Sequence, residues 1–196
     1  MTSHISCTCG QVSVKLTTPT PVTRLQCGCC DCRQALQWAQ LQGGPPATGL
    51  LADLWYFQND FIFVEGREKT FWVMLREDGR SVRCVSSCCH STLLVHHPCY
   101  QNNVLMVMAS GVRMSVPHID CKVRVYLKDL PREKVSQLEP FDGVVIDKDN
   151  LDEPGRTARE HIQELFVKRV SSPSGTNTAK EIHLNEVVVL GLKEHS

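Results

Sequence analysis

Apolar residues alternate with polar ones in several short stretches of the chain, which is the pattern of strands that bury one face. The alternating stretches run from Val12 to Leu16, Phe61 to Phe63, Phe71 to Leu75, Val104 to Met108 and Val123 to Leu127. Residues 77–80, with the sequence EDGR, supply a hairpin turn before a further apolar run that begins at Val82. The sequence therefore predicts about six or seven short strands and a mainly β fold.

Helical spacing is found in two places. A brief helix is predicted directly after the sequence CGCCDC, with Ala35, Leu36 and Ala39 on one face, and Pro45 lies beyond its end. A second helix begins at the capping box formed by Thr157 and Glu160. Its apolar residues recur at helical spacing and are Ala158, Ile162, Leu165, Phe166 and Val170.

The character of the chain changes after Pro140, where a charged loop begins. We therefore divide the chain into a β domain, residues 3–140, and a C-terminal extension, residues 141–196. The extension contains the second helix and a flexible linker, SSPSGTNTAK. Its last segment, EIHLNEVVVLGL, has strand propensity, and the sequence leaves open whether it joins the sheet or a partner.

Composition narrows the class of protein. The 196 residues are 42% apolar, with 21 basic and 21 acidic side chains, so disorder throughout is excluded. The equal numbers of basic and acidic side chains argue against nucleic-acid binding and against docking on a membrane surface. No apolar run approaches the roughly 20 residues that cross a bilayer. The start of the chain, MTSHISCTCG, lacks the features of a secretory signal, and we expect a reducing, cytoplasmic location.

The eleven cysteines are the most informative feature. An odd count in a chain of a reducing compartment is better explained by metal binding than by disulfides. Nine of them fall in three motifs: Cys7 and Cys9 in CTCG, Cys27, Cys29, Cys30 and Cys32 in CGCCDC, and Cys84, Cys88 and Cys89 in RCVSSCCHS. A Cys-x-Cys or Cys-x-x-Cys pair can place two thiolates on one tetrahedral metal. We expect metal to pin distant strands together.

The order of these motifs resembles a known family. CTCGQVSVKL, CGCCDC, an arginine with a cysteine motif, and CKVRVYLKDLP follow one another as in the glutathione-dependent formaldehyde-activating enzyme and centromere protein V family, in an uncharacterised subset with a Cys-Cys pair. The resemblance covers roughly residues 3–140. It implies a β-tent fold of short antiparallel strands that binds two zinc ions. It also implies a carbon-sulfur lyase activity on small thiol adducts such as S-hydroxymethylglutathione, which is derived from glutathione.

In this family the first and third motifs jointly hold a structural zinc. The third motif of the family has two cysteines after its arginine, and alignment from Arg83 places Ser86 at the first of them and Cys89 at the second. The resemblance therefore implies that Cys7, Cys9 and Cys89 hold the structural zinc, with Cys88 as the fourth ligand. Neighbouring side chains in a strand point to opposite faces, so Cys88 and Cys89 can share one metal only if the chain turns there. His90 or water is the alternative fourth ligand.

The middle motif holds the second zinc in this family, through three thiolates. Here those residues are Cys27, Cys29 and Cys32, and a zinc with three protein ligands keeps an open position for catalysis. Cys30 is an additional thiol in this motif. We expect it to point away, because three ligands already constrain the loop; if it closed the site, the zinc would be structural.

The other candidate residues have ordinary structural explanations. Arg33 and Gln34 could bind an anionic substrate such as glutathione, but a surface arginine needs no such role. His96 and His97 could act as a ligand pair or a general base, and a solvated loop is the favoured interpretation. The alternative to an enzyme is a non-catalytic, zinc-stabilised binding module that contacts a protein partner through the C-terminal extension.

Overall fold

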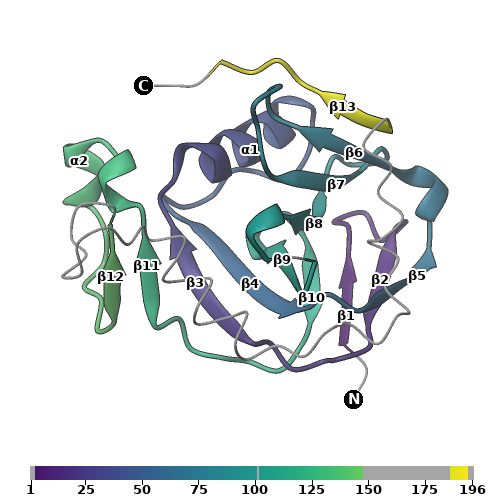
Figure 1. Ribbon diagram of the computed structural model, residues 1–196, viewed down its shortest axis with the longest axis horizontal. Coiled ribbons are helices and arrows are strands. Elements are labelled where there is room, and N and C mark those ends of the chain that lie inside the picture. Colours follow the sequence, from purple (N-terminus) through teal and green to yellow (C-terminus); the bar gives the residue numbers. More distant parts are fainter. Residues whose placement is uncertain (1–2, 101, 148–185, 194–196) are drawn as a thin grey trace.

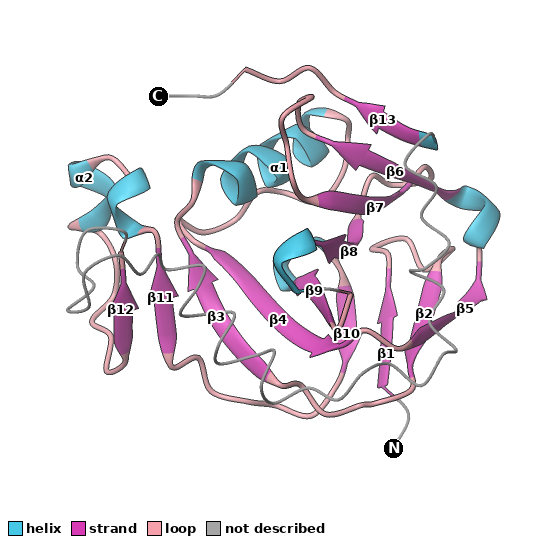
Figure 2. Cartoon of the chain, viewed as in Figure 1, coloured by secondary structure: helices cyan, strands magenta, loops and turns pink. Residues whose placement is uncertain are grey.

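The computed structural model describes residues 3–100, 102–147 and 186–193, and within them the chain is mainly β (Figures 1 and 2). Thirteen strands form two sheets in this part of the chain, together with two α-helices and four short 3-10 turns. The helices are α1, Cys30–Leu41, and α2, Arg132–Val135. The 3-10 turns are Arg67–Lys69, Pro98–Tyr100, Ala109–Gly111 and Leu127–Asp129.

The smaller sheet has four antiparallel strands in the order β10-β1-β2-β5. Their bounds are β1, Ser3–Ser6, β2, Ser13–Leu16, β5, Phe61–Glu65, and β10, Arg113–Ser115. The alternation seen in the sequence gives this sheet one buried face, on which Val14 and Leu16 are fully enclosed. The loop between β1 and β2 carries the first cysteine motif.

The larger sheet has nine strands in the order β12-β11-β3-β4-β9-β8-β7-β6-β13. Its pairs are antiparallel except for β11 with β3, β11 with β12 and β6 with β13. The bounds are β3, Thr23–Cys27, β4, Ala52–Gln58, β6, Thr70–Met74, β7, Val82–Ser86, β8, Thr92–His96, β9, Val104–Met108, β11, Val123–Val125, β12, Val144–Ile146, and β13, Val187–Val189.

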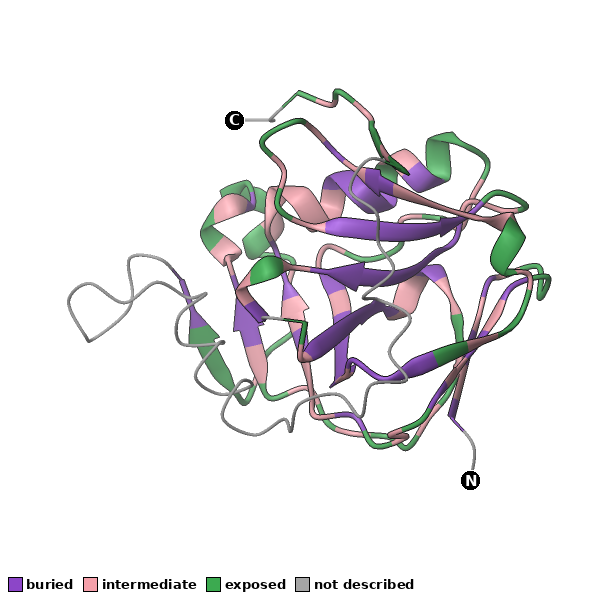
Figure 3. Ribbon diagram, turned by 45° about the vertical axis from the view of Figure 1, so that its right-hand side comes forward, coloured by how far each residue is buried: buried purple, intermediate pink, exposed green. Residues whose placement is uncertain are grey.

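The core consists of two groups of buried residues. One includes Phe57, Phe61 and Leu105 and joins the smaller sheet to the larger. The other includes Leu25, Leu36 and Met106, so it lies beside α1 and beneath the middle cysteine motif. Figure 3 shows the buried residues concentrated along the central strands, with exposed residues on the surrounding loops.

The mainly β prediction with short antiparallel strands is confirmed, but the number of strands was underestimated. The predicted helix after CGCCDC is α1, and the predicted hairpin joins β6 to β7. The segment EIHLNEVVVLGL supplies β13, which pairs with β6 at the edge of the larger sheet. The predicted helix that begins at Thr157 and the linker SSPSGTNTAK lie outside the described residues. Of the helices described, none has the length and apolar character needed to cross a membrane.

Candidate metal centres

Four cysteine sulfurs from the first and third motifs lie close together. The sulfurs of Cys7, Cys9, Cys88 and Cys89 all lie within 4.8 Å of one another. We call this group the four-sulfur cluster. Cys7 Sγ lies 3.5 Å from Cys9 Sγ and 3.9 Å from Cys88 Sγ. The cluster joins the loop after β1 to the turn between β7 and β8, and it could hold a metal ion.

Two tight turns bring these sulfurs together. In the first, Cys7 N donates to Val12 O and Val12 N donates to the Cys7 sulfur at 3.3 Å. Gly10 has a φ of 83° here, a conformation that glycine adopts without steric cost. In the second, the chain turns between β7 and β8, where His90 N donates to Ser86 O. Because the chain turns here, the side chains of the neighbouring Cys88 and Cys89 are not forced to opposite faces as they would be in a strand, and both sulfurs join the four-sulfur cluster.

His90 does not belong to the four-sulfur cluster. Its ring packs edge-on against Trp38 and Phe71, with centroid distances of 6.2 and 6.3 Å. Within the described residues, Cys88 is therefore the candidate for the fourth ligand position. Ser86, which the sequence resemblance aligned with a cysteine, places its hydroxyl 3.4 Å from the Cys89 sulfur.

Hydroxyl groups surround Cys89. Thr8 Oγ1 donates to its sulfur at 3.3 Å, and the hydroxyls of Ser86 and Ser91 both lie 3.4 Å away. Burial raises the pKa of Cys89, but the hydrogen bonds from Ser86, Ser91 and Thr8 outweigh it and lower the pKa to about 5. Cys88 shows the opposite behaviour: although its side chain is largely exposed, local desolvation and the neighbouring thiols of Cys9 and Cys7 raise its pKa to about 12. Four crowded thiols cannot all ionise without a cation, and a divalent metal removes that conflict.

The four-sulfur cluster has the dimensions of a tetrahedral thiolate site. Metal-sulfur bonds of about 2.3 Å in a tetrahedron place the sulfurs about 3.8 Å apart. The sulfur separations of 3.3, 3.5 and 3.9 Å lie close to this value. The donor set therefore fits a closed site with four sulfur ligands.

Three further sulfurs form a second group, the three-sulfur cluster. The sulfurs of Cys27, Cys29 and Cys32 lie within 4.8 Å of one another. Cys27 ends β3, Cys29 caps the N-terminus of α1, and Cys32 lies in the first turn of α1, where its backbone N donates to the Cys29 sulfur at 3.4 Å. The positive end of a helix favours thiolate at such a position. This group could also hold a metal ion.

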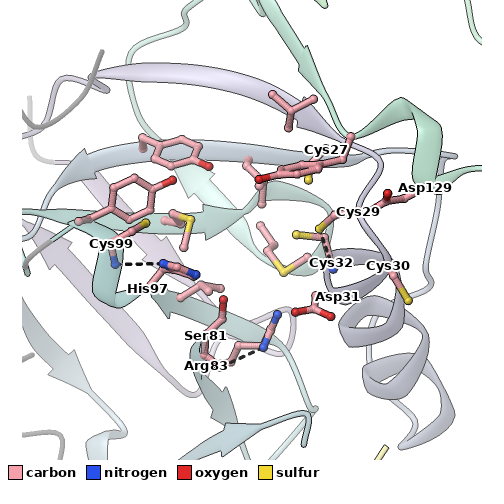
Figure 4. A pocket seen from close by; sticks show the side chains of 18 of the residues that line it. Cys27, Cys29, Cys30, Asp31, Cys32, Ser81, Arg83, His97, Cys99 and Asp129 are labelled. Carbon is pink, nitrogen blue, oxygen red and sulfur yellow. Dashed lines mark hydrogen bonds between the residues drawn. The ribbon is translucent and has the colours of Figure 1, made fainter. Parts of the chain in front are cut away.

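Cys30 is not part of the three-sulfur cluster. In Figure 4 its sulfur points away from the other three, on the opposite side of the start of α1. Hydrogen bonds from the thiols of Cys27 and Cys29 lower the pKa of Cys32, and the charge of Arg83 acts in the same direction. The pKa of Cys27 is raised by its hydrogen bonds with Cys29 and Cys32 and by burial. The three-sulfur cluster therefore offers three thiols and leaves a fourth position to another group.

The three-sulfur cluster forms one wall of a cavity of about 300 Å³ (Figure 4). The opposite wall carries polar side chains from β7 and from the segment after β8. The residues that line the rest of the cavity include Arg83, His97, Tyr56, Tyr100, Met106 and Met108. This volume is at the small end of the range for ligand pockets. A metal in the three-sulfur cluster would therefore face a space that admits a small molecule.

Two arginines lie at the cavity, and they differ in their partners. Arg76 Nη2 donates to Asp31 at 2.7 Å, and its Nε lies 3.1 Å from Asp78. Arg83 donates through Nη1 to Ser81 O at 3.2 Å, while its Nε has no hydrogen-bond partner among the described residues. Burial lowers the pKa of Arg83 despite the nearby charges of Cys32 and Asp31. The sequence singled out Arg83 as a motif residue but gave no sign that it faces a cavity.

The remaining sequence candidates have other roles. Arg33 donates to the carbonyl oxygens of Gly28 and Asp129, so it ties α1 to the following loops. Gln34 is buried and donates to Lys193 O. The solvated loop expected at His96 and His97 is wrong for His96, which is buried in β8, whereas His97 lies half-buried in the loop after β8 and lines the cavity. Strand β8 is enclosed on both faces, and its continuous apolar run hid this from a search for alternation.

In comparisons with known proteins, neither a family model nor a curated protein matches the chain.

Proposed function

We propose that the chain is a two-zinc β-tent protein of the glutathione-dependent formaldehyde-activating enzyme and centromere protein V family. We further propose that it acts as a carbon-sulfur lyase on small thiol adducts, with the three-sulfur cluster as its reactive centre. The observation that carries this proposal is the position of that cluster in the wall of the 300 Å³ cavity. A purely structural site needs no access to a cavity.

Zinc is the metal that the donor sets favour. Both clusters consist of cysteine sulfurs, and soft thiolate ligands select zinc among the abundant divalent metals. Four thiolates make a closed structural site, whereas three leave one position for a ligand. Cys7, Cys9, Cys88 and Cys89 therefore hold the structural zinc, and Cys27, Cys29 and Cys32 hold the reactive one.

The proposed reaction is the cleavage of a hemithioacetal into a thiol and an aldehyde, or its reverse. The carbon-sulfur bond breaks, the electron pair of that bond stays on the sulfur, and the hydroxyl proton of the adduct is transferred so that the products are neutral. No oxidant or reductant takes part. Bound by three thiolates, zinc supplies a Lewis acid that stabilises the sulfur anion.

The chain supplies the surroundings of this chemistry. Tyr56 and Tyr100, both buried, contact each other edge-on with ring centroids 5.8 Å apart and close one side of the cavity against water. Nδ1 of His97 accepts from Cys99 N at 3.1 Å, so in the neutral ring the proton resides on Nε2. In Figure 4 this second nitrogen lies on the cavity side of the ring. We assign to Nε2 of His97 the transfer of the hydroxyl proton.

The test follows the exchange of formaldehyde between solution and glutathione by NMR. The native protein is expected to accelerate the exchange, Cys32→Ser to abolish the acceleration, and Cys30→Ser to retain it. Cys30→Ser is the matched control, because it removes a thiol of the same motif from outside the three-sulfur cluster. A Cys32→Ser protein that exchanged as fast as the native one would remove the catalytic role, and the non-catalytic binding module would replace it.

A cytoplasmic location belongs to the same proposal. All eleven cysteines are unbridged, and seven of them serve the two clusters. Thiolate sites of this kind depend on a reducing compartment.

A further inference from the structure

Arg83 is a buried cation that faces the cavity. Its side chain is 3% exposed and comes from β7, and in Figure 4 its guanidinium points toward the start of α1, where Asp31 and Cys32 lie. The Nε–H has no acceptor among the described residues. A guanidinium needs acceptors for its five N–H groups, and leaving one buried and unpaired is costly.

The carboxylates nearby are committed to another residue. Asp31 and Asp78 both pair with Arg76, at 2.7 and 3.1 Å. Neither they nor any thiol of the three-sulfur cluster makes a hydrogen bond with Arg83 in the described part of the chain. The nearest charges therefore act on Arg83 through space. Because Arg83 lines the cavity, a ligand bound there can supply the acceptor that its guanidinium lacks.

We infer that Arg83 is the subsite for a carboxylate on the ligand, so that the cavity accepts a small thiol that carries a carboxylate group. This inference rests on the proposed function, because it takes the three-sulfur cluster as the place where the ligand sulfur binds. Arg83 and the three sulfurs line one cavity of about 300 Å³, so one small molecule can reach both. The apolar side chains of Met106 and Met108, which line the same cavity, suit the methylene groups that join a thiol to a carboxylate.

Arginine is a residue type suited to recognising a carboxylate. Its planar guanidinium binds a carboxylate through two parallel N–H bonds, and such charge-assisted bonds are about twice as strong as neutral ones. The alternative role for Arg83 is to offset the net negative charge of three thiolates around a divalent metal. That role depends only on the positive charge of Arg83 and not on the charge of the ligand. Carboxylate recognition, in contrast, requires an anionic ligand. Two thiols of the same size, one anionic and one neutral, therefore distinguish the two roles.

The experiment uses the full chain with cobalt(II) in both clusters, because the visible spectrum of cobalt reports a sulfur that joins the three-sulfur cluster. The protein is titrated with 3-mercaptopropionate and with 3-mercaptopropionamide, which has nearly the same size and no charge. We expect the native protein to bind the acid about tenfold or more tightly than the amide. In Arg83→Gln this preference is expected to disappear, and in Arg83→Lys to fall by several-fold.

The matched control is Arg80→Gln, which removes an exposed arginine from the same hairpin and should keep the native preference. Each protein is tested with both thiols, and the acid-to-amide affinity ratio is compared between proteins. Any intrinsic difference between the two thiols is therefore the same in every protein and cancels. Cobalt content and circular dichroism identify a variant that does not fold, in which case Arg83→Lys carries the test. An acid-to-amide ratio that is the same in the native protein and in the folded Arg83 variants would overturn the carboxylate subsite alone. If neither thiol changed the spectrum of the native protein, the proposed function would fall, and the subsite with it.

Discussion

The sulfurs of Cys9 and Cys88 lie 3.3 Å apart, although 79 positions separate the two residues along the chain. Cys9 belongs to the loop after β1 in the smaller sheet, and Cys88 to the turn between β7 and β8 in the larger one. Both side chains are exposed, so their proximity is not explained by burial in a core. A metal between them would close a long loop and connect the two sheets, which makes Cys88 the first residue to test.

Cys88→Ala is expected to reduce the metal content by one ion per chain and to lower the midpoint of thermal unfolding, because the four-sulfur cluster loses one of its four ligands. Native mass spectrometry counts the metal, and circular dichroism follows unfolding. His90→Ala is the matched control, since it changes the same turn and leaves the four sulfurs in place. Loss of metal in His90→Ala with retention in Cys88→Ala would reverse the assignment of the fourth ligand.

Metal removal is expected to proceed in two steps. The three-sulfur cluster, with one ligand fewer, should release its ion at a lower chelator concentration, and the fold should survive this step. Release from the four-sulfur cluster should unfold the β domain, because a structural zinc contributes on the order of 10 to 16 kcal/mol in small peptides, against roughly 5 to 15 kcal/mol for the stability of a whole domain.

A titration with a strong chelator, followed by metal content and circular dichroism on the same samples, checks both steps. Strand signal that persists after both ions have been removed would contradict the structural role of the four-sulfur cluster. Unfolding that coincides with the first ion would contradict the division between a structural and a reactive site.

Cys32→Ser is expected to lose the metal of the three-sulfur cluster and to keep its fold. The replaced sulfur lies in the first turn of α1, whereas the helix is held by its own buried residues, among them Ala35 and Leu36. Metal content should fall by one ion, and the free energy of unfolding should fall because the lost ion no longer stabilises the folded state, while the far-UV circular dichroism spectrum is retained. Cys30→Ser should keep both ions; a loss of metal there would place Cys30 among the ligands.

The sequence predicted those parts of the fold that depend on a local pattern. Val12, Val14 and Leu16 alternate with polar residues and are buried, the last two within β2, and the Asp-Gly turn joins β6 to β7. Strand β8 has no alternation because both of its faces are enclosed, and β10 and β12 have three residues each, too few for a period of two to be recognised. These strands form by pairing with strands that are distant in the sequence, and a local sequence pattern does not reveal such pairing.

The cysteines of both clusters could be named from their spacing, but the cavity could not. Its polar wall combines Arg83 on β7 with His97 after β8, residues that carry no shared motif. Arg83 lines the cavity from β7, a strand whose residues are all buried. The role of a buried arginine depends on the residues around it, and for Arg83 these come from α1 and the β6-β7 hairpin, whose arrangement the sequence does not predict.

His96 provides a test of the buried strands that does not involve the cavity. Its ring is 6% exposed, packs against Trp72 with centroids 5.7 Å apart, and has no hydrogen-bond partner for Nε2 among the described residues. Burial lowers the pKa of His96 to about 4, from an ordinary value of 6.5. Between these two values the unfolded chain takes up a proton that the folded chain refuses.

The free energy of unfolding should therefore fall as the pH is lowered from about 6.5 to about 4, and His96 alone should account for about 3 kcal/mol of that loss. Above pH 6.5 its contribution is fully present. His96→Gln cannot take up this proton, so its urea-unfolding free energy should fall less steeply over the same range, by up to about 1.4 kcal/mol per pH unit. Acid release of metal from the clusters affects both proteins equally and cancels in the comparison. Parallel pH profiles for the two proteins would show that His96 is protonated in the fold, and thus that β8 is not enclosed as described.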